Sequence, residues 1–269
     1  MGRRKKQWTV AAVQMTSTGD LRANVKSASK RIREAAAAGA ELIALPENFA
    51  YLRAEGSRPA FKTTLDGDLV RSMRALAREI GRHLLLGSIP EKVPRSPRVH
   101  NTSVLLAPGG DLLATYRKLH LFDVMLVDAD EEYNESSAIQ PGDHTLVVET
   151  PFGNIGVAIC YDLRFPVFSR NREDYDLLFY VANWPARRAA HWRSLLVARA
   201  IENQACVVGV NRIGADANGL TYSGDSLAID ARGERGLEPT LVLDQFQLGR
   251  VADHRVDDLG AVLGLEVGE

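Results

Sequence analysis

Residues 154–166 read NIGVAICYDLRFP, an apolar run that ends at a cysteine and then turns polar at once. The run predicts a buried strand, and the break after Cys160 predicts that the thiol lies at the end of that strand. A sharp turn after a strand leaves fresh backbone N–H groups beside the side chain, a geometry that nucleophiles use in other folds. A cysteine taken alone is more often a buried core residue. Two segments far upstream favour the nucleophile.

These two segments also place ionisable side chains at predicted strand ends. In residues 45–49, LPENF, Glu47 follows an apolar strand and a proline. In residues 115–122, TYRKLHLF, Lys118 closes a strand before an apolar step. Taken alone, Glu47 reads as a solvated loop carboxylate and Lys118 as a surface lysine. Beside a thiol, both side chains could have a catalytic role, because free cysteine has a pKa of about 8.5 and must be activated at neutral pH.

Together, the three segments resemble the nitrilase, or carbon–nitrogen hydrolase, superfamily. The matching motifs are PEN at Glu47, YRKLHLFD at Lys118 and GVAICYDLRFP at Cys160, in the order and with the spacing usual in that family. The resemblance covers residues 8–235 and implies a catalytic triad of these three residues. A second glutamate often lies between the lysine and cysteine motifs, and Glu135 matches that position.

The residue types imply a role for each group. Glu47 would accept the thiol proton and later activate water. Lys118 would favour the thiolate and, with the backbone N–H of Tyr161, would stabilise the oxyanion of a tetrahedral intermediate. Attack on an amide would give a thioester acyl-enzyme and ammonia, after which water would release the acid. Glu135 would position the amide or the ammonia and hold Lys118 in register.

The chain combines features of two neighbouring branches of the family. Residues 160–171 and 178–188 are similar to the omega-amidase branch, which hydrolyses the terminal amide of short dicarboxylate monoamides such as 2-oxoglutaramate. The segments around Glu47 and Lys118 are closer to the branch that acts on deaminated glutathione. We expect an omega-amidase reaction that yields acid plus ammonia. Deaminated glutathione as substrate is one alternative, and a catalytically silent scaffold of the same fold is another.

Substrates of both branches carry a free carboxylate, which needs a cation in the pocket. Arg164 is the candidate, because a guanidinium can hold a carboxylate with two parallel hydrogen bonds. A structural salt bridge is the alternative role for this side chain. The further candidates for substrate binding are Tyr51, Asn183, Trp184 and Arg187.

Strand and helix patterns alternate along the chain. Amphipathic helices are predicted after Asp20, over 69–82 and over 191–205, the last with Leu195 and Ile201 facing inward. No linker divides the chain, which favours one α/β domain with helices on both outer faces. The family resemblance implies a four-layer α-β-β-α sandwich with the active site at strand ends on one rim.

We expect the carbon–nitrogen hydrolase domain to occupy residues 8–235, after a basic flexible tail at residues 1–7. The family usually closes with a helix that carries an Arg and a Phe-Pro step. Residues 236–269 lack that step, so we expect an atypical C-terminal extension of the same domain. We also expect a homodimer packed through helices near residues 165–175 and 191–205.

Composition limits the partners of this chain. Its 269 residues carry a formal net charge of −1, so no global field directs it to nucleic acid or to a membrane. No apolar run is long enough to span a membrane, and the basic N-terminus lacks the apolar region of a signal peptide. The chain has only two cysteines, which favours a reducing cytoplasm over a disulfide scaffold. Cys206, in an apolar strand, is expected to be buried and inert.

One rival hypothesis is a thiol protease that pairs Cys160 with a histidine, for which His120 and His191 are the candidates. It leaves the Glu47 and Lys118 motifs unexplained. A metal hydrolase is weaker, because the chain has no HExxH, CxxC or His-x-His spacing. The sequence therefore implies neither a metal nor a cofactor.

Overall fold

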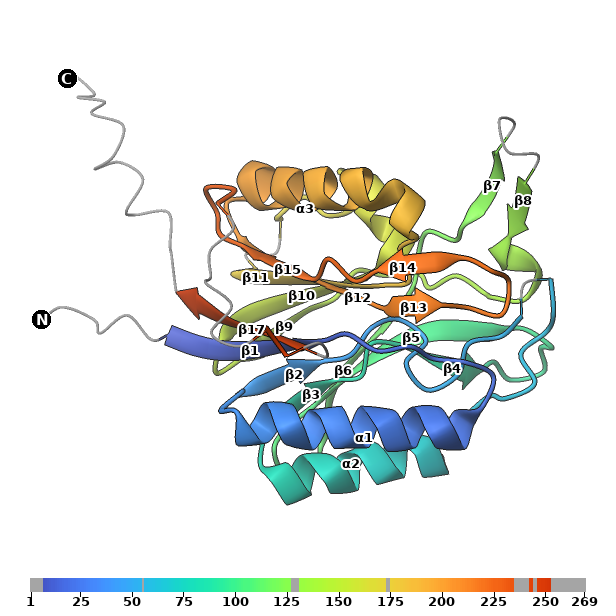
Figure 1. The fold of residues 1–269 in the computed structure, drawn as a ribbon, viewed down its shortest axis with the longest axis horizontal. Helices are drawn as coiled ribbons and strands as arrows, with labels where there is room; N and C mark the ends of the chain where they lie inside the picture. Colours follow the sequence, from blue (N-terminus) through green and yellow to red (C-terminus); the bar gives the residue numbers. More distant parts are fainter. Residues whose placement is uncertain are drawn as a thin grey trace, which may run out of the picture.

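The computed structural model describes residues 7–54, 56–126, 131–172, 175–234, 242–243 and 246–252. Within these residues, two large β-sheets lie face to face, and α-helices cover the outer face of each sheet (Figure 1). The arrangement confirms the predicted four-layer α-β-β-α sandwich. In the same described residues, no helix combines the length and the apolar character needed to cross a membrane.

The first sheet consists of β1 (Gln7–Val13), β2 (Leu42–Ala44), β3 (His83–Leu85), β4 (Ile89–Lys92), β5 (Val99–Leu106), β6 (Leu112–Arg117), β16 (Val242–Leu243) and β17 (Phe246–Ala252). It runs in the order β16-β17-β1-β2-β3-β5-β4, and β6 also pairs with β5. The second sheet consists of β9 (Val147–Thr150), β10 (Gly153–Ile159), β11 (Leu177–Ala182), β12 (Cys206–Asn211) and β15 (Leu227–Ile229). It runs in the order β15-β12-β11-β10-β9.

The remaining strands form two hairpins outside these sheets: β7 (Asp123–Leu126) with β8 (Glu131–Asn134), and β13 (Ile213–Ala215) with β14 (Thr221–Ser223). The α-helices of the described chain are α1 (Leu21–Ala37), α2 (Asp68–Ile80) and α3 (Ala189–Asn203). Helices α1 and α2 cover the first sheet, and α3 covers the second (Figure 1). Short 3-10 helices are η2 (Glu135–Ser137), η3 (Cys160–Arg164) and η4 (Ala186–Arg188).

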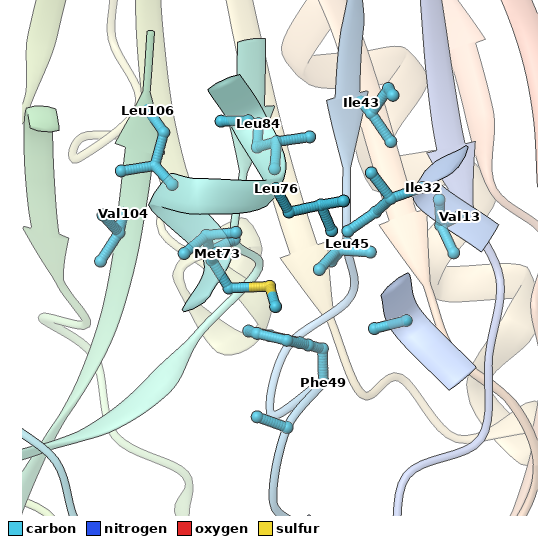
Figure 2. Packing of buried hydrophobic residues seen from close by; sticks show 14 of the residues in the cluster. Val13, Ile32, Ile43, Leu45, Phe49, Met73, Leu76, Leu84, Val104 and Leu106 are labelled. Atoms are coloured by element: carbon cyan, nitrogen blue, oxygen red, sulfur yellow. The ribbon is translucent and has the colours of Figure 1, made fainter. Parts of the chain in front are cut away.

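Local sequence explains the limits of the first two helices. Asp20 caps α1, because its side chain accepts a hydrogen bond from the backbone N–H of Ala23. Helix α2 ends at Gly81, whose φ of 62° is a left-handed conformation that suits glycine. Figure 2 shows Ile32 of α1 and Met73 of α2 packed against side chains of the first sheet. Both helices therefore lie where the apolar spacing predicts them.

The inward face of α3 differs from the predicted one. Trp192, Leu196 and Ala200 are buried against the second sheet, whereas Ile201 is 50% exposed. Apolar residues occur on more than one face of this helix, and the face that includes the large indole of Trp192 buries more apolar surface than the face through Leu195. The helix is rotated accordingly.

The predicted helix near residues 165–175 is wrong, because residues 166–169 form a turn and the other described residues of this stretch have no regular structure. The Asn171 side chain donates a hydrogen bond to the backbone oxygen of Tyr175 and accepts one from its N–H. Such side-chain bonds satisfy backbone groups outside a helix and compete with helix formation. The homodimer through α3 stays a prediction.

The predicted domain boundaries meet the described residues only in part. Gln7, in the predicted tail, already pairs with Ala252 as the first residue of β1. Strand β17 lies antiparallel along the whole of β1, so part of the predicted extension over 236–269 belongs to the first sheet. Residues 1–6 of the predicted tail, and residues 236–241, 244–245 and 253–269 of the extension, lie outside the described residues.

Strand direction brings several strand ends to one rim of the sandwich. Strands β1, β2 and β3 are parallel, and so are β10, β11 and β12. Strand β6 is antiparallel to β5, which is antiparallel to β3, so β6 ends at the same edge as β2. The residues that follow the ends of β2, β6, β10 and β11 are, in turn, Glu47, Lys118, Cys160 and Asn183. Carboxyl ends of parallel strands are where α/β proteins build their sites.

Candidate active site

The backbone turns sharply at Cys160. Strand β10 ends at Ile159, and Cys160 begins η3 with a φ of 49°, in a left-handed region that residues with a Cβ rarely adopt. Strained backbone of this kind persists only where the surrounding contacts hold it. Here the Asp162 carboxylate accepts a hydrogen bond of 2.9 Å from the Ile159 N–H. The predicted strand end followed by a sharp turn is therefore present.

Asp162 also ties this turn to the lysine segment. It is fully buried and accepts hydrogen bonds from the Tyr116 hydroxyl (2.7 Å) and from the backbone N–H of His120 (2.9 Å). The Nδ1 of His120 lies 2.8 Å from the same carboxylate, and its ring stacks on Phe165. His120 is thus held by Asp162, and in the described chain it makes no hydrogen bond to Cys160. Sequence reasoning missed Asp162, although an acid two residues after the thiol was a usable signal.

The segment after β2 holds Glu47 inside the protein. Leu45 and Phe49, on either side of it, are fully buried in the core that α1 and α2 close (Figure 2). Glu47 is only 3% exposed, so it is not a solvated loop carboxylate. Its Oε1 accepts a hydrogen bond of 2.8 Å from Asn101, and its Oε2 accepts one of 2.8 Å from the Asn183 N–H. These bonds fix both oxygens of the carboxylate.

Lys118 lies between two carboxylates and is 2% exposed. Its Nζ is 3.2 Å from Oε1 of Glu47 and 2.9 Å from Oε2 of Glu135. Glu135 is itself held by the Phe122 N–H at 2.7 Å. Burial alone would lower the pKa of Lys118, but the charges of Glu135 and Glu47 raise it well above its usual value. The lysine is therefore a buried, permanently charged ammonium and not a surface side chain.

The thiol of Cys160 interacts electrostatically with Glu47, Lys118 and Glu135. Burial raises its pKa well above the usual value, and the charge of Glu47 raises it further, whereas Lys118 and a hydrogen bond from the Asn183 backbone lower it. Lys118 therefore favours the thiolate, as the sequence predicts, but burial and the charge of Glu47 oppose it and keep the thiol pKa above its usual value. Cys206, the other free cysteine, is buried as predicted.

These charges predict how fast iodoacetamide alkylates Cys160. In the wild type, alkylation should be slow near about pH 7 and still rising near about pH 9, because only the thiolate reacts. Glu47→Gln removes the charge that raises the thiol pKa and leaves the lysine that lowers it, so the pKa should fall. Each pKa unit by which the thiol is lowered gives about tenfold more thiolate, while the nucleophilicity of that thiolate falls about threefold. Alkylation should therefore speed up at least about threefold.

The control for this experiment is Glu135→Gln, because Glu135 raises the thiol pKa less than Glu47 does. Its acceleration should be the smaller of the two. Mass mapping of the modified peptide separates Cys160 from Cys206. Unchanged or slower alkylation in Glu47→Gln would contradict the electrostatic account of this site.

A cavity of about 160 Å³ opens at this rim of the sandwich. Its wall contains all the residues that the sequence proposes for the site: Glu47, Tyr51, Lys118, Glu135, Cys160, Tyr161, Arg164, Asn183, Trp184 and Arg187. The cavity also has a wall that sequence reasoning missed, formed by Asp216, Asn218, Leu220 and Tyr222 on and beside the hairpin β13–β14. No local signal marks these residues, since only the fold brings the hairpin to the rim.

Arg164 lines the cavity without a carboxylate partner. Its Nη2 lies 3.0 Å from Nδ1 of His191, and its guanidinium lies 5.1 Å from the ring centroid of Trp184. Among the described residues it forms no ion pair, so the structural salt bridge considered above is not found. A cation at the wall of a cavity, unpaired with any described acid, is suited to an anionic ligand.

The other candidate residues for substrate binding differ in the hydrogen bonds that they already make. The hydroxyl of Tyr51 accepts a hydrogen bond of 3.2 Å from the Ala60 N–H. Arg187 donates to the hydroxyl of Tyr133 at 2.9 Å, which joins η4 to the hairpin β7–β8 at the cavity mouth. The side-chain oxygen of Asn183 is buried and has no hydrogen-bond partner in the part of the chain that the structure describes. It is the candidate best prepared to accept a bond from a ligand.

Comparison with known proteins gives consistent results. The sequence profile of the family described as "Carbon-nitrogen hydrolase" matches residues 9–241. Omega-amidase YafV of Escherichia coli is 43% identical over 196 residues, covering 73% of this chain and 71% of that protein. A deaminated glutathione amidase of Synechocystis is 35% identical over 260 residues, covering 93% of this chain and 95% of that protein.

Among solved structures, a CN-hydrolase superfamily protein of Xanthomonas campestris is 32% identical to this chain. The two superpose with a TM-score of 0.79 over 95% of this chain and 93% of the other. That structure carries an arsenic adduct in its active site. Fold and sequence therefore point to the same group of proteins.

Proposed function

The chain belongs to the carbon–nitrogen hydrolase family, whose chemistry is amide hydrolysis, and from that premise we propose that it is an omega-amidase with Cys160 as its nucleophile. One observation carries the proposal: a charged lysine is buried between Glu47 and Glu135 in the wall of the same cavity as Cys160. Removing a charge from water costs several kcal/mol unless partners compensate, so a buried charge cluster in a cavity wall indicates a functional site.

In the first half of the proposed reaction, Glu47 takes the proton of the Cys160 thiol as the sulfur attacks the amide carbon. A general base suits this thiol, because burial and Glu47 keep its pKa high and the proton must leave during attack. The ammonium of Lys118 has three N–H donors, enough for two carboxylates and the developing oxyanion. The Tyr161 N–H would be the second oxyanion donor.

The tetrahedral intermediate then collapses. The C–N bond breaks, Glu47 returns its proton to the nitrogen, and ammonia leaves behind a thioester on Cys160. In the second half, Glu47 takes a proton from water, the hydroxide attacks the thioester, and the carboxylic acid leaves as the thiol is reprotonated. Glu135 keeps Lys118 in register through both halves and positions the amide or the ammonia.

We assign recognition of the substrate carboxylate to Arg164, which forms no ion pair among the described residues and lines the cavity. The identity of 43% to an omega-amidase favours a short substrate of the 2-oxoglutaramate type. The nearly full-length match to a deaminated glutathione amidase supports the alternative substrate. Both substrates require the same cation, so Arg164 alone does not discriminate between them.

The test is a comparison of kcat/KM for ammonia release from 2-oxoglutaramate, deaminated glutathione and pentanamide, a neutral amide. We expect 2-oxoglutaramate to be the best substrate. Arg164→Gln should raise KM for 2-oxoglutaramate about 10- to 100-fold, the usual loss when a hydrogen-bonded charge is removed. The same variant should leave pentanamide hydrolysis unchanged.

Two outcomes would overturn the assignment. A higher kcat/KM for deaminated glutathione would move the chain to the alternative substrate. Silence towards the whole panel, together with a Cys160 that iodoacetamide does not modify, would favour the scaffold. A thiol protease has less support, because His120 is bound to Asp162 and stacked on Phe165.

A further inference from the structure

His191 is an exposed residue in the first turn of α3, beside Arg164 of the cavity wall, and has no part in the proposed reaction. Its Nδ1 is 3.0 Å from Nη2 of Arg164, which comes from the end of η3. Since the guanidinium can only donate hydrogen bonds, Nδ1 must accept with its lone pair. The ring therefore carries its proton on Nε2 and is neutral while this contact exists.

A second contact restrains the same guanidinium. The Trp184 ring lies 5.1 Å from the central carbon of Arg164, within the range of a cation–π interaction. This ring is firmly held, because its indole N–H donates to the Arg188 backbone oxygen at 2.8 Å and it packs against Trp192. One face of the guanidinium is thus covered by an aromatic ring, and one N–H is occupied by an imidazole.

The chemistry of these partners leaves the charge of Arg164 intact. A carboxylate in the place of His191 would orient the guanidinium equally well, but it would neutralise the cation and compete with an incoming anion. A neutral imidazole orients the guanidinium without neutralising its charge. Four of the five N–H donors remain for a ligand, enough for two parallel hydrogen bonds to a carboxylate.

We propose that His191 is a positioning residue for substrate recognition: it fixes the Arg164 guanidinium against Trp184 so that the cation is preorganised for a carboxylate. The inference rests on the proposed function, since it deepens the role given there to Arg164. Preorganisation lowers the entropy lost on binding, so its loss appears in affinity. His191 touches neither Cys160 nor the Glu47–Lys118–Glu135 cluster in the described structure, so the chemical step should be unaffected.

Two variants of His191 separate the effect of its hydrogen-bond acceptor from the effect of its ring size. His191→Phe keeps a ring of similar size and removes the acceptor, whereas His191→Asn loses the ring but places an oxygen near the position of Nδ1. For 2-oxoglutaramate, we expect His191→Phe to raise KM about 5- to 10-fold, the effect of one hydrogen bond at a partly solvated site, with kcat within about twofold. His191→Asn should return KM close to the wild-type value. The KM for pentanamide should not change in either variant.

His144→Phe is the matched control, because His144 is an exposed histidine paired with Asp143 and does not line the cavity. It should behave as wild type with both amides. Adding His191→Phe to Arg164→Gln should raise KM little beyond the effect of Arg164→Gln alone, since the two residues act through one contact.

The outcomes distinguish this inference from the proposed function. If Arg164→Gln shifts KM for 2-oxoglutaramate and His191→Phe does not, the positioning role is refuted and carboxylate recognition by Arg164 stands. If His191→Phe raises KM for pentanamide as much as for 2-oxoglutaramate, the role is merely structural and the inference also fails. If Arg164→Gln itself leaves the preference for the charged amide unchanged, the assignment of carboxylate recognition to Arg164 is refuted. The positioning role of His191, which rests on that assignment, is then refuted as well.

Discussion

Cys160→Ala is expected to lower ammonia release from 2-oxoglutaramate by at least about 10⁴-fold, as when the nucleophile of other acyl-transfer enzymes is removed. Alanine offers no group that can form the thioester, and water has no comparable position near the amide. The fold should survive, because both residues carry a Cβ and the strain at a φ of 49° is unchanged. Ammonia assays and thermal unfolding of the same preparations measure the two effects.

Cys206→Ala is the control for thiol loss. Cys206 is buried in the core between the sheets, so the variant should lose a little stability and keep its kcat. A Cys160→Ala protein that still turns over would refute the assigned nucleophile. An unfolded Cys160→Ala protein would contradict the expectation that alanine leaves this turn intact.

Lys118→Met should damage both catalysis and stability. Loss of one oxyanion donor lowers the rate about 10²- to 10³-fold. Removal of the ammonium also leaves Glu47 and Glu135 buried without the cation that they share, and breaking a buried ion pair costs about 3–5 kcal/mol. Initial rates and urea unfolding check the two expectations separately.

A second substitution separates the two effects of losing Lys118. Lys118→Met combined with Glu135→Gln should recover part of the free energy of unfolding, because one uncompensated charge is gone, but it should recover no activity. Arg117→Met is the matched control, since Arg117 is the adjacent cation and pairs with Glu91 away from the cavity. It should lose stability and retain kcat. Full stability in Lys118→Met would contradict the claim that the lysine holds the two carboxylates together.

Features that depend on neighbouring residues were predictable. The apolar run before Cys160 predicts strand β10 and the break after it, and Asp20 predicts the cap of α1. The predictions failed where packing against another element or a side-chain hydrogen bond decides the outcome. In α3, two apolar faces compete, and the partner surface of the second sheet selects the one that carries Trp192. At residues 165–175, where the dimer expectation placed a helix, side-chain bonds of Asn171 satisfy backbone groups instead.

By itself, the sequence determined the kind of chain this is: an alternation of strands and helices, the turn at Cys160 and the identity of the three motifs. These follow from short-range patterns and from the residues present. The tertiary structure alone decided the charge states and partnerships at the rim. Lys118 is charged while buried because Glu47, 71 positions away, and Glu135, 17 positions away, meet its ammonium. Electrostatic energy depends on distance in space and on burial, and the spacing of residues along a chain determines neither.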